Sequence, residues 1–450
     1  MKNRLLLLLV SVGIQAISLP SIASPRLVKY CASTVFRETP FADIRCAKEI
    51  SSEQASSIKH FEFEYDTQGR LTSVQYKLKN RLVPYSDRFV RAPRTKIQYL
   101  HNQEIRTYFD ENNLPTLVSG DVYQSLFILN KLGQRKSVKF LNLDGNLVNN
   151  DFGIAAYNWT VLENGQVVET RVNADDDLVR NRPGFGYMIT RFAYDSNGLL
   201  TRMYNWGSKG TALTPDEAGV VMTKISYSPV GQFKQWLNLD IDGKPVKGMS
   251  AIAEIIYQPS QFRGEKEAYF FDANGSPQLT RWGAHRVSYE FDAFGNEKAI
   301  SYFDTHNTLT ESTSGIARIV NTWTNDGMTQ TTESYFSKSN KAAASSYSGV
   351  HKIITDTNDE SKPKRRYFTD LQGKLVQHPG LGYAQETFEY DKHGGVSERR
   401  FLDVVGKQIN HKTWGISKVT TTRQENGTLQ SVQNFDAKGE LVNASWDPAH

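Results

Sequence analysis

A turn motif that returns about every 33 residues constrains the fold of this chain more than any other feature. Its clearest copies are residues 388–394 (FEYDKHG) and 400–406 (RFLDVVG), each of the form Asp-x-x-Gly after aromatic residues. With gaps of 30 to 34 residues, the first turn recurs at Gly69, Gln103, Gly133, Gly165, Gly198, Gly231, Gly264, Gly295, Gly327, Ser361, Gly394 and Gly427. With gaps of 32 or 33, the second recurs at Gly145, Asp177, Gly210, Gly243, Gly275, Asn307, Asn340, Gly373, Gly406 and Gly439. Such self-similarity predicts a tandem array of about twelve units.

Each unit has the chemistry of a β-hairpin. Asp or Asn opens the turn, because its side chain can accept hydrogen bonds from backbone NH groups ahead, and Gly closes it with a positive φ. Before the turn, aromatic residues alternate with polar ones, as in Phe61, Phe63 and Tyr65. A period of two places these side chains on one face of a strand. We therefore expect an all-β protein in which every unit holds two strands, a tight turn and a longer return loop.

The number of units predicts the shape of the array. One hairpin cannot stabilise itself, so neighbouring hairpins must share a core. Two dozen strands at about 4.8 Å each would make a flat sheet on the order of 110 Å wide, and open sheets rarely exceed about 10 strands without curling. Tandem antiparallel β-hairpin repeats forming a coiled or shell-like extended sheet are therefore expected, with a six-bladed β-propeller as the alternative.

The start of the chain predicts export. Lys2 and Arg4 precede a short apolar run, and residues 21–23 (SIA) supply the small residues of a cleavage site. Residues 1–23 are therefore predicted to be a signal peptide, which places the mature chain in the periplasm or outside the cell. No later segment is apolar enough to cross a bilayer, so no transmembrane insertion is expected after cleavage.

Two further segments follow the signal peptide. Residues 24–58 lack the repeat and are expected to form an N-terminal cap, whereas residues 59–450 form the tandem β-hairpin repeat domain. The cap holds both cysteines, Cys31 and Cys46. Because an exported chain matures in an oxidising compartment, a disulfide between them is predicted.

The turn at residues 65–72 (YDTQGRLT) resembles the core motif of YD (RHS-type) repeats. Weaker copies lie at residues 194–198, 291–295 and 390–394. The resemblance implies hairpins that coil into a β-shell on an exported protein. The period here is longer than that family's usual unit, and no C-terminal toxin domain follows the array, so the resemblance implies no toxin function.

Motifs of catalysis, metal binding and cofactor binding are lacking, so no enzyme, metal or cofactor is predicted. Residues 238–243 (NLDIDG) match the opening of a calcium loop, but Met249 stands where that loop needs an acidic ligand. Two pairs of residues recur in register on adjacent units. His378 and His411 lack a third ligand, whereas Arg366 and Arg399 indicate either a solvated face or a small patch for an anionic ligand.

Two apolar columns run through the second strands. The residues just before the second turn are predicted to form a core column: Leu141, Trp206, Leu239, Phe271, Phe303, Phe336, Leu402 and Phe435. Adjacent strand residues point to opposite faces, so the preceding column is either covered by return loops or open. As candidate binding residues it supplies Phe270, Tyr302, Tyr335, Phe368 and Phe401, with Trp282 and Trp414 on the return loops.

An open ladder of aromatic rings would suit a sugar polymer, since exposed apolar stripes mark binding surfaces. The leading hypothesis is an exported, non-enzymatic binding or scaffold module for a polymer (glycan or cell wall) or a protein surface. A purely structural component of the envelope and a glycan-active enzyme are the alternatives. The net charge falls from +5 to +3 when Lys2 and Arg4 leave (5 − 2 = 3), which does not favour nucleic acid as a partner.

Overall fold

The computed structural model describes residues 27–85, 92–181, 186–207, 210 and 212–443. The predicted signal peptide, residues 1–23, lies outside this range. The first strands and the single short helix are β1 (Leu27–Thr34), β2 (Cys46–Ile50), α1 (Ser52–Ala55), β3 (Lys59–Tyr65), β4 (Leu71–Leu78), β5 (Arg81–Leu82), β6 (Arg94–Leu100), β7 (Gln103–Phe109), β8 (Gln124–Leu129) and β9 (Arg135–Leu141).

The remaining strands follow the repeat. They are β10 (Ala156–Val161), β11 (Val167–Val172), β12 (Thr190–Tyr194), β13 (Leu200–Asn205), β14 (Met222–Tyr227), β15 (Phe233–Leu239), β16 (Glu254–Pro259), β17 (Glu265–Phe271), β18 (Arg286–Phe291), β19 (Glu297–Phe303), β20 (Arg318–Trp323), β21 (Gln330–Phe336), β22 (Lys352–Thr357), β23 (Pro363–Thr369), β24 (Gln385–Tyr390), β25 (Val396–Leu402), β26 (Lys418–Arg423) and β27 (Leu429–Phe435).

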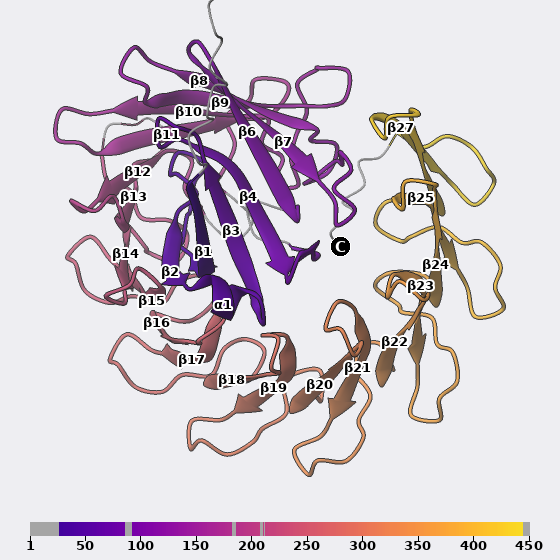
Figure 1. Cartoon of the computed structure of the whole chain (residues 1–450). Coiled ribbons are helices and arrows are strands. Elements are labelled where there is room, and N and C mark those ends of the chain that lie inside the picture. Colours follow the sequence, from indigo (N-terminus) through magenta and orange to yellow (C-terminus); the bar gives the residue numbers. More distant parts are fainter. Residues whose placement is uncertain (1–26, 86–91, 182–185, 208–209, 211, 444–450) are drawn as a thin grey trace, which may run out of the picture.

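All of these strands belong to one antiparallel sheet of 27 strands. Beyond β6 each strand pairs with the next in sequence, both within a hairpin and between hairpins. Figure 1 shows that this sheet coils around the first strands, β1 to β4, and that the last strands, β23 to β27, lie across the coil from β12 to β15. The predicted all-β array of coiled hairpins is confirmed. The propeller alternative is wrong, because the ladder is not divided into blades.

The turns have the predicted chemistry. In the first one, Asp66 Oδ1 accepts hydrogen bonds from the backbone N–H groups of Gln68 and Arg70, both at 2.9 Å. Gly69 closes that turn at φ 76°. The turn predicted at about Gln103 is present but shorter than the others, and its left-handed residue is His101. At the second turn Asp176, not Asp177, has the positive φ.

From β15 on, each return loop contains a third turn that the sequence analysis did not separate. Many of these turns carry a glycine of positive φ, including Gly283, Gly315, Gly349, Gly382 and Gly415. Successive third turns join through backbone hydrogen bonds, such as Thr313 N–H to Trp282 O at 3.0 Å and Lys412 N–H to Leu381 O at 2.8 Å. The loops therefore support one another along one rim of the coil.

The first strands extend the sheet and lie inside the coil. β1 pairs with β3 on one side and with β2 on the other, so β2 forms the first edge. Cys31 on β1 and Cys46 at the start of β2 are joined by a disulfide with 5.7 Å between their Cα atoms. The pairing predicted from sequence is present.

First turns from distant hairpins converge on these inner strands. Arg45 donates hydrogen bonds to the carbonyl oxygens of Asn197 and Gly198 at 2.6 and 2.8 Å. Arg81, on β5, forms an ion pair with Asp326 at 3.0 Å and donates a hydrogen bond to the Glu360 carbonyl at 3.1 Å. The first-turn end of the coil is therefore fixed to the first strands of the chain by side chains that reach backbone groups.

The two faces of the sheet have different surroundings. Phe36, which follows β1, contacts Phe233 and Trp236 with ring centroids 4.5 and 6.2 Å apart, so the face bearing Trp236 is the inner one. Phe270 and its equivalents share that face. The predicted core column lies on the opposite, outer face, where every member except the buried Leu239 is only half-buried. The prediction of a single core column is corrected: the inner column is the more buried of the two in several repeats.

Candidate binding face

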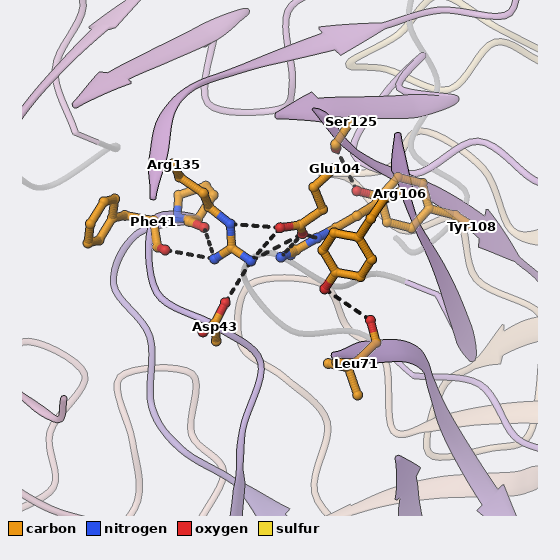
Figure 2. Close-up of polar contacts among 10 residues, drawn as sticks. Phe41, Asp43, Leu71, Glu104, Arg106, Tyr108, Ser125 and Arg135 are labelled. Atoms are coloured by element: carbon orange, nitrogen blue, oxygen red, sulfur yellow. Dashed lines mark hydrogen bonds and ion pairs between the residues drawn. The ribbon is translucent and has the colours of Figure 1, made fainter. Parts of the chain in front are cut away.

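In the first half of the coil, polar contacts fix residues 35–45, which we call the N-terminal segment, to the inner face of the sheet. Arg135 Nη2 lies 2.8 Å from Glu104 Oε2 and 2.7 Å from Asp43 Oδ1, and Nη1 donates to the Phe41 carbonyl at 2.7 Å. Arg106 donates from Nε to Glu104 Oε1 at 2.7 Å, and Figure 2 shows Glu104 between the two guanidinium groups. Burial alone would raise the pKa of Glu104, but Arg106 and Arg135 outweigh it and hold that pKa below its usual value. Glu104 is therefore an ionised anchor for the segment.

A second buried carboxylate, Glu169 on β11, also contacts the N-terminal segment, two hairpins further along the chain. Glu169 and Arg171 are fully buried, with Glu169 Oε1 2.5 Å from Arg171 Nη1. Thr39 of the N-terminal segment and the indole N–H of Trp159 both donate to Glu169 Oε2. Burial raises the pKa of Glu169 despite Arg171. The inner face of the first hairpins is thus occupied by the chain's own residues.

The inner face of the last hairpins retains a pocket of about 270 Å³, which we call the aromatic pocket. It is lined by Gln330, Thr332, Glu333, Ile353, Thr355, Arg366, Phe368, Leu381, Tyr383, His411 and Trp414. Strands β21, β22 and β23 supply its floor, and the third turns at Leu381 and Trp414 supply its rim. Aromatic rings beside a few polar groups are typical of pockets that bind organic ligands.

Aromatic contacts hold the rings of the pocket in place. The ring of Trp414 lies 3.8 Å from that of His411, and Tyr383 lies 5.6 Å from both Phe368 and His411. His411 Nδ1 accepts the backbone N–H of Thr413 at 3.2 Å. Burial, followed by the positive charge of Arg399, lowers the pKa of His411 to about 4. The imidazole is therefore neutral near pH 7 and acts as a packing partner for Trp414.

The predicted pair Arg366 and Arg399 meets at one carboxylate. Glu386, on β24, is fully buried, and Arg399 Nη2 lies 2.5 Å from its Oε2. Arg366 Nη1 lies 3.3 Å from the other oxygen, and the Arg366 side chain is 41% exposed. The ion pair with Glu386 neutralises Arg399, whereas Arg366 lines the aromatic pocket with its remaining N–H donors.

The structure divides the predicted aromatic ladder into two groups. Phe270, Trp282 and Tyr302 form one, in which the Trp282 ring lies 5.6 Å from Phe270 and 5.5 Å from Tyr302. Phe368 and Trp414 line the aromatic pocket, with the fully buried Phe401 5.5 Å from His411.

Tyr335 stands between these groups and donates to Glu333 at 2.6 Å. Return loops therefore cover part of the ladder and leave the pocket beside Phe368 accessible.

Sequence reasoning missed Tyr383 and Glu333. Tyr383 follows the third-turn glycine Gly382, a position that Ile316 and Ile416 occupy in other units. Tyr187, after Gly186, is another aromatic residue in this mainly aliphatic column, and these two tyrosines were a signal that could have been found. Glu333 lacked any such signal, because carboxylates are frequent throughout the array.

The outer column is covered by cations of the neighbouring strand. Arg286 lies 3.7 Å from the ring centre of Phe303, and Lys418 lies 4.6 Å from that of Phe435. Such cation–π contacts cover the ring faces with the stems of long side chains. These two outer rings are therefore partly shielded from solvent.

The part of the chain that the structure describes has neither a cluster of metal ligands nor a membrane-spanning helix. No group of three or more His, Cys, Asp or Glu side chains is placed to hold a metal ion in that part of the chain. The calcium-like residues 238–243 form an ordinary second turn, where Asp240 Oδ1 accepts the backbone N–H groups of Asp242 and Lys244. Among the described helices, none is long and apolar enough to cross a membrane.

Comparisons with known proteins identify no family. No family model and no curated protein matches this chain. The crystal structure of TcdB2-TccC3 resembles it at 11% identity and a TM-score of 0.25, over 87% of this chain and 25% of that one.

Two further solved structures show weaker similarity. A eukaryotic initiation factor matches at 11% identity and a TM-score of 0.16, over 95% of this chain and 99% of the other. An alternansucrase in complex with isomaltononaose matches at 11% identity and a TM-score of 0.12, over 74% and 20%. TM-scores this low assign neither a family nor a function.

The fold therefore defines the class. This chain is an all-β protein built of tandem β-hairpins in one coiled sheet, and the resemblance to YD repeats holds as far as that hairpin array. Its first hairpins are filled on the inner face by residues 35–45, and its last hairpins carry an accessible aromatic pocket.

Proposed function

We propose that this chain is an exported, non-enzymatic binding module that holds a polysaccharide on the inner face of its last hairpins. The observation that carries the proposal is the aromatic pocket, in which Trp414 and Tyr383 lie beside Glu333 and Arg366. A sugar ring has apolar C–H faces that stack on aromatic rings and hydroxyl groups that pair with carboxylates, amides and guanidinium groups. The disulfide between Cys31 and Cys46 is compatible with an exported protein.

The carboxylates of the pocket support binding rather than hydrolysis. Most glycosidases need two carboxylates that flank the scissile bond. Glu333 lines the pocket, but the nearby Glu386 is fully buried and neutralised by Arg399. A lone accessible carboxylate suits recognition of hydroxyl groups.

Replacing Trp414 by leucine is expected to weaken polysaccharide binding by about tenfold. An aromatic stacking contact contributes on the order of 1.4 kcal/mol, which corresponds to that factor. Leucine keeps most of the apolar volume, so the fold should persist. The measurement is co-sedimentation of the purified protein with insoluble peptidoglycan, chitin and cellulose.

The matched control is Phe303→Leu, the same kind of change on the outer face of the same sheet. It should leave retention unchanged. If Phe303→Leu weakens retention and Trp414→Leu does not, the binding face has been assigned wrongly. If none of the three polymers retains the wild-type protein, polysaccharide binding should be abandoned in favour of a structural role in the envelope.

A further inference from the structure

The last hairpins also contact the turn that follows β7, in the early part of the coil. Arg423, on β26, donates a hydrogen bond to the carbonyl oxygen of Pro115 at 2.7 Å, across 308 residues of sequence. Its Nη2 lies 3.6 Å from Asp110 Oδ2, and its Nε lies 3.4 Å from Asp391 Oδ2. Residues 110–115 follow β7, so these contacts join the seventh strand to the last hairpins. We call this contact the seam.

A pocket of about 290 Å³ lies at the seam, and its walls come from both sides of it. We call it the seam pocket. Its lining is mainly apolar and includes Pro84, Leu117, Phe388, Val419, Leu429 and Val432. A pocket of this volume is at the lower end of the range for small-molecule sites. Its occupant should therefore be a small molecule with an apolar body.

The charged residues that line the described part of the seam pocket are two carboxylates and two arginines, and both arginines are already paired. Asp110 and Glu111 both line it, and Glu111 has no ion pair with any described residue. Arg399, which also lines it, is neutralised by the buried Glu386. Arg423 is shared between Asp110 and Asp391.

Lys362, close to the seam pocket, is also paired. Lys362 lies over the ring of Tyr390, which lines the seam pocket, but its ammonium forms an ion pair with Glu360 at 2.9 Å. Among the described residues, Arg423 thus forms ion pairs with both Asp110 and Asp391, and Glu111 forms none.

The surroundings of Asp110 raise the pKa of its carboxyl group. Burial, followed by the negative charge of Glu111, raises the pKa of Asp110 to about 7, because Arg423 only partly offsets them. A cation placed beside Asp110 would favour the ionised form of that carboxyl group. The site is therefore complementary to a positive charge attached to an apolar group.

We propose that the seam pocket binds a small apolar amine, whose ammonium group pairs with Asp110 and Glu111 while its hydrocarbon body lies against Leu117, Val419 and Val432. This site is separate from the aromatic pocket and does not depend on the proposed function. Binding would also connect the two sides of the seam, since the ammonium contacts the turn after β7 and the hydrocarbon contacts β26 and β27.

The test is isothermal titration calorimetry of the full mature chain at pH 8, where Asp110 is mostly ionised. The probe is 2-phenylethylammonium, compared with 2-phenylethanol and 3-phenylpropionate, which have the same ring without a positive charge. The ammonium is expected to bind at least about tenfold more tightly than the alcohol, and the carboxylate should not bind. Equal binding of the alcohol or the carboxylate would overturn the proposal, as would no heat from the ammonium.

Variants locate the site. Glu111→Gln should weaken binding of 2-phenylethylammonium by about tenfold. Glu163→Gln is the matched control, because exposed Glu163 occupies the second position of another turn. Asp110→Asn is a second variant that keeps the turn, since Asn130 and Asn142 accept the same backbone hydrogen bonds elsewhere. Undiminished affinity in both seam variants, or an equal loss in Glu163→Gln, would show that the amine binds elsewhere.

Discussion

Replacing Glu104 by glutamine should lower the free energy of unfolding by about 3–5 kcal/mol. Glutamine has nearly the same shape, but it removes the negative charge that Arg106 and Arg135 share. Both guanidinium groups are buried, with side chains 5% and 8% exposed, so water cannot replace the lost partner. Urea unfolding, followed by tryptophan fluorescence, measures the change.

The matched control for Glu104 is an ion pair on the surface. Glu217 lies 3.1 Å from Arg180, and both side chains are more than half exposed. Exposed pairs contribute about 0–1 kcal/mol, so Glu217→Gln should have little effect. Equal losses of stability in the two variants would mean that Glu104 does not anchor the N-terminal segment.

Acidification should destabilise the last hairpins through His411. Its pKa is lowered to about 4 in the folded chain, below the value of about 6.5 for an unfolded histidine. A lowered pKa means that the unfolded state binds the proton more tightly, so the stabilisation is present above pH 6.5 and is lost as the pH falls toward 4. The difference corresponds to about 3 kcal/mol.

The variant His411→Gln isolates this effect, because glutamine stays neutral. Urea unfolding at pH 7 and pH 4 should show a smaller loss of stability in the variant than in the wild type, by about 3 kcal/mol. His306→Gln, at an exposed position, should behave as the wild type does. A loss of stability that is the same in all three proteins would show that His411 does not titrate as described.

Local sequence predicted the hairpins well, because their turns depend on neighbouring residues. Asp66 and Gly69 specify one such turn without any help from distant parts of the chain. The turn that ends at Asn113 belongs to the same class, 32 residues before Gly145 (145 − 113 = 32), but it was not included in the pattern, although turns with the same residue at Asn307 and Asn340 were. His101 was missed because a shorter turn changes the spacing.

The inner and outer faces could not be assigned from sequence. Phe303 and Tyr302 are adjacent and both aromatic, so their order along the strand does not say which one faces the inside of the coil. That assignment depends on contacts across the fold, such as Phe36 against Trp236. The ion pairs of Glu104 with Arg135 and of Glu386 with Arg399 escaped for the same reason, because each joins two different strands.

Covalent footprinting with a carbene reagent, with and without the polysaccharide that retains the protein, tests the proposed binding face most directly. Bound polymer should reduce labelling of Trp414 at the rim of the aromatic pocket. Labelling of Phe303 and Phe336 on the outer face, and of Val405, which is 84% exposed on a second turn, should stay the same. Protection of the outer column with unchanged labelling of Trp414 would contradict a binding site on the inner face of the coil.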